Sequence, residues 1–228
     1  CLDDKLMPMY IDKLPNVTNH IPTIFDIKYE SGLTKYTIEE EKLHHLSHVL
    51  RIKNESYVKV TNGRGIISLG KMLNSQIIIL ETEANERTSE LNIFISKIQD
   101  KTRMRFLVEK LTELGIKSIT IGPTENSQKV NIDFKKLNLW IVGAVEQSGI
   151  SFVPEVIIED ELDFNKFQHA FDLTGESLKS NIMHNNFAIG PEGGWSKGEL
   201  ENFRYISKLS DFTLRADTAA IVAVSLMM

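Results

Sequence analysis

The amino-acid sequence predicts an α/β protein with a mainly parallel sheet, preceded by a smaller β-rich module. From Leu91 onward, apolar strand-like segments alternate with helix-like segments, which is typical of βα units. Before that point, two short apolar runs flank Asn62-Gly63, the strongest short-range signal for a β-hairpin. The 228 residues suffice for one large domain or two small ones, and we divide the chain into domains 1–85 and 86–228.

In the first module, Thr37 and Glu40 have the spacing of a capping box, which predicts that a helix begins there. Apolar residues then follow at helical spacing: Leu43, Leu46, Val49 and Leu50. Residues 57–60 and 66–69 are expected to pair as the hairpin, and residues 77–82 as a further strand. The polar residues 85–90 predict a linker.

In the second module, periodicity and turn residues set the order of the elements. Strands are expected at 91–98, 118–122, 167–175, 185–189 and 212–214. Helices are expected at 102–114, where Gly115 ends the helix, at 136–149, from Ser196, and at 216–228.

The segment FAIGPEGGWSKGELENF, residues 187–203, ends an expected strand and begins an expected helix. Ser196 and Glu199 have capping-box spacing, so residues 190–194 form a tight turn between the two elements. Glycine permits positive φ and close approach of a ligand, although a plain turn is the simpler interpretation. The segment lacks the Gly-Lys-Ser/Thr ending of a P-loop and the G-x-G-x-x-G spacing of a dinucleotide site.

Ligands of open parallel sheets bind at the carboxyl ends of the strands. The expected loops at 173–175, 190–194 and 214–218 all lie at such ends. These three loops therefore predict one ligand site at a single edge of the sheet.

The net charge of −5 is unevenly distributed along the chain. Residues 42–71 contain six Lys/Arg and one acid, and residues 97–117 contain six against three. Residues 155–176 reverse the balance, with seven acids and one lysine. This pattern favours an anion-binding face on the first half of the chain, with ordinary solvated charge as the alternative.

The single cysteine, Cys1, excludes an intrachain disulfide and fits a reducing, cytoplasmic setting. Apolar runs are too short for a membrane span, and the first residues lack the apolar core of a signal peptide. We therefore expect no membrane association.

Seven short segments carry further information: H-L-S-H-V-L-R-I-K (45–53), N-G-R-G (62–65), V-E-K-L-T-E-L-G-I (108–116), E-Q-S-G (146–149), V-P-E-V (153–156), I-G-P-E-G-G (189–194) and T-L-R-A-D-T-A (213–219). The last two are the most specific. Together, and in this order, they make the chain resemble the SPOUT-class ribosomal RNA small-subunit methyltransferase E family.

This resemblance implies S-adenosylmethionine-dependent methylation of N3 of a uridine in small-subunit (16S) ribosomal RNA. It implies a PUA-like β-barrel for RNA over residues 1–85 and a SPOUT domain with a trefoil knot over residues 86–228. The knot loops would hold S-adenosylmethionine, and a homodimer would place the site near the subunit interface. The partner would be the ribosomal RNA or the assembled small subunit.

The chain departs from the family pattern at several positions. Residues 209–212 read Leu-Ser-Asp-Phe where the family usually has Leu-Gly-Pro-Arg, and Asp217 stands where Glu is usual. Asn126 and Ile150 replace common arginines, so the RNA contacts are expected to differ. The stretch between Lys136 and Glu146 is short for the family, which left open whether residues are missing there.

The resemblance also selects candidate site residues. Cofactor binding is expected at Leu173, Thr174, Ile189, Gly190, Pro191, Gly193, Gly194, Leu214, Thr218 and Ala219. Catalytic candidates are Arg215, Glu192, Lys110 and Glu113. Arg215 would stabilise negative charge on the uracil or orient a phosphate, with a salt bridge to Glu192 or Asp217 as the alternative. Glu192 would bond a cofactor hydroxyl or hold its loop.

Lys110 and Glu113 lie three residues apart on one helix face, so a surface ion pair is their simplest role. The expected RNA-backbone contacts are Arg51, Lys53, Arg64, Lys101, Arg103 and Arg105. We expect no metal site, and both tryptophans, Trp140 and Trp195, are expected to serve packing.

Two other functions remain open at this stage. One is a non-catalytic RNA-binding or ribosome-assembly protein that retains the fold. The other is an α/β enzyme that binds a phosphorylated metabolite through the 190–194 turn. Binding of S-adenosylmethionine, followed by a methyl-transfer assay, separates these alternatives from the methyltransferase.

Overall fold

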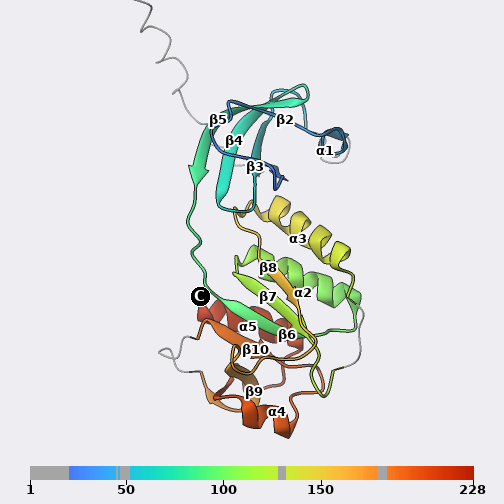
Figure 1. Cartoon of the computed structure of the whole chain (residues 1–228), viewed down its shortest axis with the longest axis vertical. Helices are drawn as coiled ribbons and strands as arrows, with labels where there is room; N and C mark the ends of the chain where they lie inside the picture. Colours follow the sequence, from blue (N-terminus) through green and yellow to red (C-terminus); the bar gives the residue numbers. More distant parts are fainter. Residues whose placement is uncertain (1–20, 45, 47–51, 128–131, 179–183) are drawn as a thin grey trace, which may run out of the picture.

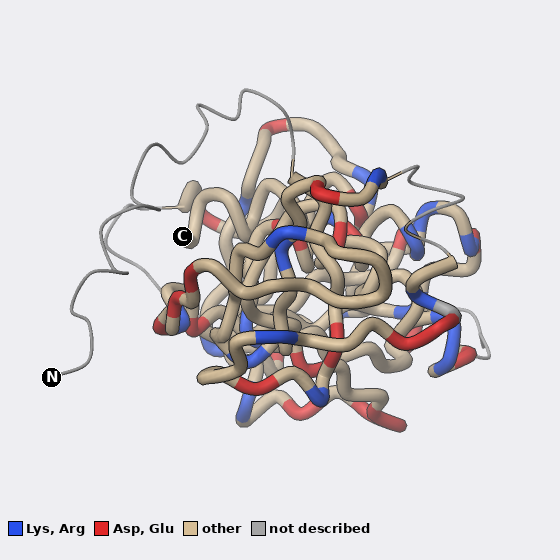
Figure 2. Tube along the Cα trace, turned by 90° about the horizontal axis from the view of Figure 1, so that it is seen from above, with Lys and Arg blue, Asp and Glu red and all other residues tan. Residues whose placement is uncertain are grey.

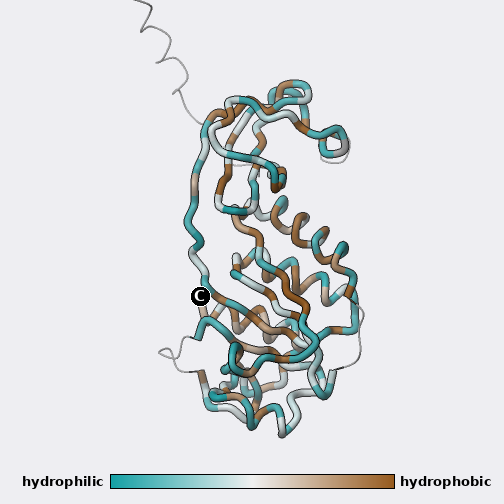
Figure 3. The backbone as a smooth tube through the Cα atoms, viewed as in Figure 1, coloured by the Kyte–Doolittle hydropathy of each residue, from teal (hydrophilic) through white to brown (hydrophobic). Residues whose placement is uncertain are grey.

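The computed structural model describes residues 21–44, 46, 52–127, 132–178 and 184–228. Among these residues the chain forms two sheets, one of five strands and one of six. The smaller sheet lies at one end of the molecule and the larger sheet occupies the rest (Figure 1). The chain that joins β5 to β6 runs extended between them and is hydrophilic (Figure 3).

The smaller sheet has the strand order β1-β3-β4-β5-β2. Its elements are β1 (Thr23–Phe25), β2 (Lys35–Thr37), α1 (Glu40–His44), β3 (Tyr57–Thr61), β4 (Ile66–Leu73) and β5 (Gln76–Ala84). The predicted hairpin is confirmed, because β3 and β4 pair antiparallel on either side of Asn62-Gly63. Buried side chains from all five strands, such as Val58, Val60 and Ile77, form a core of this sheet alone.

The predicted start of the first helix is wrong. Thr37 is the last residue of β2, where it pairs with Gln76, and α1 begins at Glu40. Tyr36 is buried between exposed Lys35 and Thr37, so this segment has the alternating burial of a strand and not the capping geometry of a helix. Leu46 is buried as expected of an apolar helix position, whereas Val49 and Leu50 lie outside the described residues.

The larger sheet has the order β11-β9-β10-β6-β7-β8, and every pairing between its neighbours is parallel. Its strands are β6 (Asn92–Ser96), β7 (Ser118–Gly122), β8 (Glu155–Ile158), β9 (His169–Ser177), β10 (Asn186–Ile189) and β11 (Tyr205–Lys208). The helices are α2 (Lys101–Glu113), α3 (Phe134–Ser148), α4 (Lys197–Asn202) and α5 (Ala216–Met227). The predicted alternation of strands and helices, with a parallel sheet, is confirmed.

The central strands β6, β7 and β10 are buried on both faces, as expected for a parallel sheet covered by helices. Ile93 and Ile95 of β6 belong to the core shared with α2, α3 and α5. Phe94, between them, points to the opposite core, which contains Trp195 and Phe203. Because successive side chains of a strand point to opposite faces, three adjacent residues serve two cores.

One predicted strand is wrong and several others went unpredicted. Residues 212–214 form no strand; the last strand is β11, which precedes them. The segment 212–214 instead leads into α5 and borders the pocket described below. The strands β1, β2, β8 and β11 were not predicted; each has three or four residues and, unlike the equally short β10, no glycine-rich turn motif directly after it. The stretch between Lys136 and Glu146 lies within the continuous helix α3.

The two sheets contact each other through the hairpin turn of the smaller one. The carbonyl of Gly63 accepts a hydrogen bond from the amide of Val153 at 2.9 Å, and the amide of Gly65 donates to Ser151 at 2.8 Å. Gly63 has φ of +69°, and a Cβ there would lie 2.7 Å from the ring of Phe25. The glycine is therefore required both by the turn and by this close approach. No helix in the described part of the chain is long and apolar enough to span a membrane.

Candidate active site

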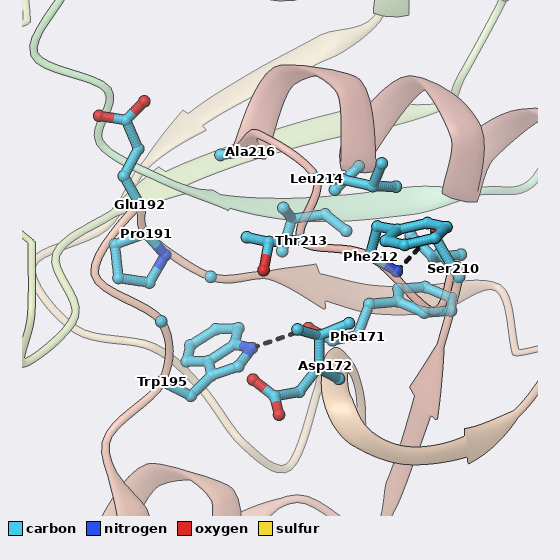
Figure 4. A pocket seen from close by; sticks show the side chains of 16 residues that line it. Phe171, Asp172, Pro191, Glu192, Trp195, Ser210, Phe212, Thr213, Leu214 and Ala216 are labelled. Carbon is cyan, nitrogen blue, oxygen red and sulfur yellow. Dashed lines mark hydrogen bonds between the residues drawn. The ribbon is translucent and has the colours of Figure 1, made fainter.

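A pocket of about 280 Å³ opens at the carboxyl edge of the larger sheet, after the ends of β10 and β11 and beside a segment within β9. Three segments line it, as Figure 4 shows: residues 171–173, residues 189–195, and residues 209–219 at the start of α5. These segments contain the three loops predicted to converge, and the structure brings them together. The lining is mostly apolar, with backbone groups and a few polar side chains.

The first segment is a bulge in β9. Ala170 pairs with Ile206 and Glu176 pairs with Ser207, so the residues between them have no partner on β11. Asp172 stabilises the bulge, because its carboxylate accepts hydrogen bonds from the amide of Thr174 at 2.9 Å and from its hydroxyl at 2.7 Å. The bulge carries Leu173 to the pocket with 48% of its surface exposed. The predicted loop is thus an interruption within a longer strand.

The second segment is the turn that follows β10. The amide of Gly194 donates to the carbonyl of Pro191 at 2.9 Å, and Gly194 has φ of +73°. The turn leads directly to Trp195, whose indole N–H donates to the carbonyl of Phe171 at 3.2 Å. A Cβ at Gly190 would lie 2.8 Å from the Trp195 ring, so the glycine allows the indole to pack against the backbone. Ser196 and Glu199 then form the predicted capping box of α4.

The third segment runs from β11 to α5. Leu209, Ser210, Phe212, Thr213 and Leu214 line the pocket, followed by Ala216 and Ala219 on the first turns of α5. The amide of Phe212 donates to the hydroxyl of Ser210 at 3.1 Å, yet the Phe212 ring is 79% exposed. The pocket therefore has an exposed aromatic ring at its rim.

An ion-pair cluster ties two of these segments to α2. Arg103 donates to both carboxylate oxygens of Asp217 at 2.9 Å, and also contacts the carboxylate of Glu192. The Arg103 side chain is 18% exposed and that of Asp217 is 12% exposed. The hydrogen bonds from Arg103 hold the pKa of Asp217 below its ordinary value, and both carboxylates raise the pKa of Arg103. Both partners of the pair are therefore charged near neutral pH.

A comparison with protein families decides the class of this domain. Residues 85–228, which include every segment of the pocket, match the model described as RNA methyltransferase domain. The chain belongs to this RNA methyltransferase family.

Known proteins resemble the methyltransferase over most of its length. The ribosomal RNA small subunit methyltransferase E of Buchnera aphidicola is 26% identical over 217 residues, covering 83% of this chain and 86% of that protein. The solved structure of a ribosomal RNA small subunit methyltransferase E from Neisseria gonorrhoeae, bound to S-adenosyl methionine, has a TM-score of 0.77 at 24% identity. That likeness covers 91% of this chain and 97% of the other.

A Legionella pneumophila structure in complex with the bound cofactor SAM has a TM-score of 0.74 at 24% identity, and covers 92% of this chain and 97% of the other. At this level of identity, the two solved structures establish a shared fold. The predicted family resemblance is confirmed.

Most of the predicted cofactor residues of the methyltransferase lie in the pocket. The pocket is lined by Leu173, Ile189, Gly190, Pro191, Gly194, Leu214 and Ala219. Thr174, Gly193 and Thr218 do not line it. The Thr174 hydroxyl bonds Asp172 within the bulge, and a Cβ added at Gly193 would lie 3.2 Å from Asn126.

The catalytic candidates of the methyltransferase occupy different places. Arg215 is exposed between the pocket residues Leu214 and Ala216, as the N-cap residue of α5, and among the described residues it forms no ion pair. The salt bridge considered for Arg215 is made by Arg103 instead. Glu192 extends away from Trp195 and Asp172 in Figure 4, and its carboxylate contacts Arg103.

Lys110 and Glu113 form the ion pair expected from their spacing, at 2.8 Å. They lie in the last turns of α2, whereas Arg103 lies at its start. A helix rises 1.5 Å per residue, so Lys110 is roughly 10 Å further along α2 than Arg103. The structure does not bring this pair to the pocket of the same chain.

The RNA-contact candidates are also dispersed. Lys53, Lys101 and Arg105 are exposed, although Arg105 pairs with Glu109 at 2.6 Å. Arg64 is exposed and donates to the carbonyl of Ile27 at 2.9 Å, while Arg51 lies outside the described residues. Figure 2 shows lysines and arginines interspersed with acids over the molecule. Of the five candidates that the structure describes, Arg103 is the one that forms an ion pair with a pocket residue, Glu192.

Sequence analysis missed several lining residues: Phe171, Asp172, Trp195, Leu209, Ser210, Phe212, Thr213 and Ala216. All are within two residues of a predicted site position, except Leu209 and Ser210. These two lie where the chain departs from the family pattern, and that departure was the available signal.

Proposed function

We propose that this chain transfers a methyl group from S-adenosylmethionine to N3 of a uridine in small-subunit (16S) ribosomal RNA. The observation that carries the proposal is the convergence of the β9 bulge, the 190–195 turn and the 209–219 segment on one pocket. This pocket lies inside the segment that matches the RNA methyltransferase family. The related Buchnera protein, a ribosomal RNA small subunit methyltransferase E, supports the substrate class.

The pocket residues fit a small organic cofactor with one apolar ring and several polar groups. The volume of about 280 Å³ is close to the lower limit of roughly 300 Å³ for small-molecule sites. Leu173, Ile189 and Leu214 offer apolar surface for adenine, and Gly190 brings backbone to the lining. S-adenosylmethionine, when bound, supplies an electrophilic methyl group.

The chain must also position the uridine and either promote loss of its N3 proton or stabilise the anion that results. N3 of uridine carries a proton, so the reaction requires its removal or stabilisation of the resulting anion. Arg215 is exposed beside Leu214 and Ala216, and no ion pair with a described residue neutralises it. We assign Arg215 to the negative charge that develops on the uracil. Glu192, paired with Arg103, holds the turn rather than taking the proton.

The remaining family features belong to the same proposal. The smaller sheet would be a PUA-like barrel that binds RNA, with the domain boundary near residue 85. The larger domain would be a knotted SPOUT domain that acts as a homodimer in the cytoplasm. Lys110 and Glu113 would then take part in the reaction only if a second copy of the chain places its own pocket next to them. The substrate would be the ribosomal RNA, free or assembled in the small subunit.

Calorimetry with S-adenosylmethionine and methyl transfer to undermethylated small subunits test the proposal. Mass spectrometry of the digested nucleosides should detect N3-methyluridine. Arg215→Ala should abolish turnover while it keeps the cofactor affinity, and Arg204→Ala is the matched control, because Arg204 stacks on Tyr205 outside the pocket. Cofactor binding without transfer would favour an RNA-binding assembly protein, and no binding would refute the proposal.

A further inference from the structure

A second cavity, of about 390 Å³, lies beside the first turns of α2 and α3. Its lining combines lysines with apolar side chains: Lys97, Ile98, Lys101, Met104, Ile132, Asp133, Lys136, Leu137 and Trp140. It shares no lining residue with the cofactor pocket. Neither the family match nor the proposed chemistry assigns it a role.

The second cavity opens at the same edge of the sheet as the cofactor pocket. Lys97 directly follows β6, and β6 pairs in parallel with β10, whose end carries the 190–195 turn. The first turn of α2 separates the two sites. Lys101 and Met104, three residues apart on one helix face, line the second cavity. Arg103, from the same turn, points the other way, to Glu192 of the cofactor pocket.

The rim of the second cavity favours an anion. Lys97, Lys101 and Lys136 line it, and neither Lys97 nor Lys101 makes an ion pair with a described residue. The one carboxylate in the lining, Asp133, is already engaged. It caps α3 through the amide of Lys135 at 3.0 Å and lies 3.7 Å from the ammonium of Lys136. The site therefore retains positive charge at an opening that faces solvent.

The floor of the second cavity suits a flat ring. Ile98, Met104 and Leu137 are buried there, and Trp140 is half-buried. Trp140 packs against the hydrophobic core as predicted, and it also forms part of the cavity wall. Nucleobases stack on aromatic side chains in proteins that bind single-stranded RNA, while lysines contact the phosphates. The combination of cationic rim and aromatic wall fits one nucleotide.

We propose that this second cavity holds a nucleotide of the RNA substrate next to the one that is methylated. Lys97, Lys101 and Lys136 contact its phosphate, and its base lies against Trp140. The inference rests on the proposed function, because it assumes that the neighbouring uridine is methylated by a cofactor bound in the first pocket. The α2 turn then separates two successive nucleotides of a single strand.

The double variant Lys97→Gln/Lys101→Gln tests the phosphate contacts. Its KM for undermethylated small subunits should rise about tenfold or more, with the KM for S-adenosylmethionine unchanged. The salt dependence of binding to oligouridylate should become shallower by roughly one unit in log–log slope, as expected for lost phosphate contacts. Lys135→Gln is the matched control, because Lys135 is exposed on the same turn of α3 but does not line the cavity. Equal effects in both variants would overturn the proposal.

Substitution of Trp140 tests the base contact separately from charge. Trp140→Phe retains a ring face and should keep most of the affinity for oligouridylate, whereas Trp140→Leu should lose it with no change in cofactor affinity. Equal affinity of both variants would refute stacking. If Trp140→Leu instead converts a dimer to a monomer in sedimentation experiments, the cavity is an interface between copies and the proposal fails.

Failure of this inference is distinguishable from failure of the proposed function. A wild-type chain that binds no S-adenosylmethionine refutes the methyltransferase proposal. A wild-type chain that methylates small subunits, and whose KM for them is unaffected by Lys97→Gln/Lys101→Gln, refutes only the nucleotide cavity.

Discussion

Arg103 and Asp217 are separated by 114 residues, yet the guanidinium of one donates two hydrogen bonds of 2.9 Å to the carboxylate of the other. This pair joins the first turn of α2 to the first turn of α5, and Glu192 adds the turn after β10. Two-pronged arginine–carboxylate pairs fix orientation as well as contributing energy. The cluster therefore fixes the position of two walls of the proposed cofactor pocket relative to α2.

Arg103→Ala should lower the free energy of unfolding by about 1–3 kcal/mol, because it leaves the Asp217 carboxylate largely buried without its partner. It should also weaken S-adenosylmethionine binding, which calorimetry measures. Arg105→Ala is the control, since Arg105 is 60% exposed and pairs only within the helix with Glu109. That variant should change stability by under about 0.5 kcal/mol. Equal losses in both variants would contradict a special role for the cluster.

Gly190→Ala should reduce cofactor affinity and lower the free energy of unfolding by about 1–3 kcal/mol, because the added methyl overlaps the Trp195 ring. Gly143→Ala provides the contrast. Gly143 lies within α3 with no atom within 4 Å of an added Cβ, so alanine should stabilise the helix by about 0.5–1 kcal/mol. Denaturant titrations and calorimetry on the two variants measure both effects. Unchanged affinity in Gly190→Ala would show that the Trp195 contact is irrelevant to the pocket.

Stability should fall as the pH drops below about 6.5, because of His169. Burial, together with the neighbouring His184, lowers the pKa of His169 to about 4. The unfolded chain therefore binds a proton between pH 6.5 and 4 that the folded chain does not, so stability is full above this window and is lost on acidification. The loss at pH 5 relative to pH 7 should be about 2 kcal/mol.

His169→Gln removes the titration and serves as the comparison for that pH dependence. The glutamine side chain can still reach toward the hydroxyl of Ser207, to which the imidazole is hydrogen-bonded at 2.9 Å. Unfolding free energies of both proteins at pH 7 and pH 5 give the difference. If His169→Gln lost the same unfolding free energy between pH 7 and pH 5, the pH dependence would have to come from other groups.

Ser196→Ala should cost about 1 kcal/mol of stability, because the serine hydroxyl accepts a hydrogen bond from the amide of Glu199 at 3.1 Å. Ser225→Ala is the matched control within α5. The Ser225 hydroxyl donates to the carbonyl of Ile221, a carbonyl within the same helix, so its removal should matter little. Thermal unfolding of the two variants measures both effects. A larger drop in melting temperature for Ser225→Ala than for Ser196→Ala would argue against the capping role.

Sequence patterns predicted the longer elements well. The β6 and β7 strands and the α2 and α3 helices have apolar residues at the period of their structure, and their ends carry Asp100, Asp133 and Gly149 as caps. Strands of three or four residues, such as β8 and β11, are too short for a period to be recognisable. Thr37 was misassigned because a capping-box spacing occurred by chance at the end of a strand.

The site was partly predictable for a similar reason. The Gly190–Gly194 turn has a local signature in glycine, proline and the capping box that follows it, and it does line the pocket. The Arg103–Asp217 pair has no local signature, because its partners come together only when α2 and α5 pack against the same sheet. The second cavity likewise depends on how α2 and α3 meet.

The first turn of α2 has one further consequence. One of its residues, Arg103, reaches toward the cofactor pocket, while Lys101 and Met104 border the other cavity. Any shift of this turn on occupation of one site would change the other without domain motion. Thermodynamic linkage then requires reciprocity: whatever factor the methyl donor applies to RNA affinity, the RNA must apply to affinity for the methyl donor.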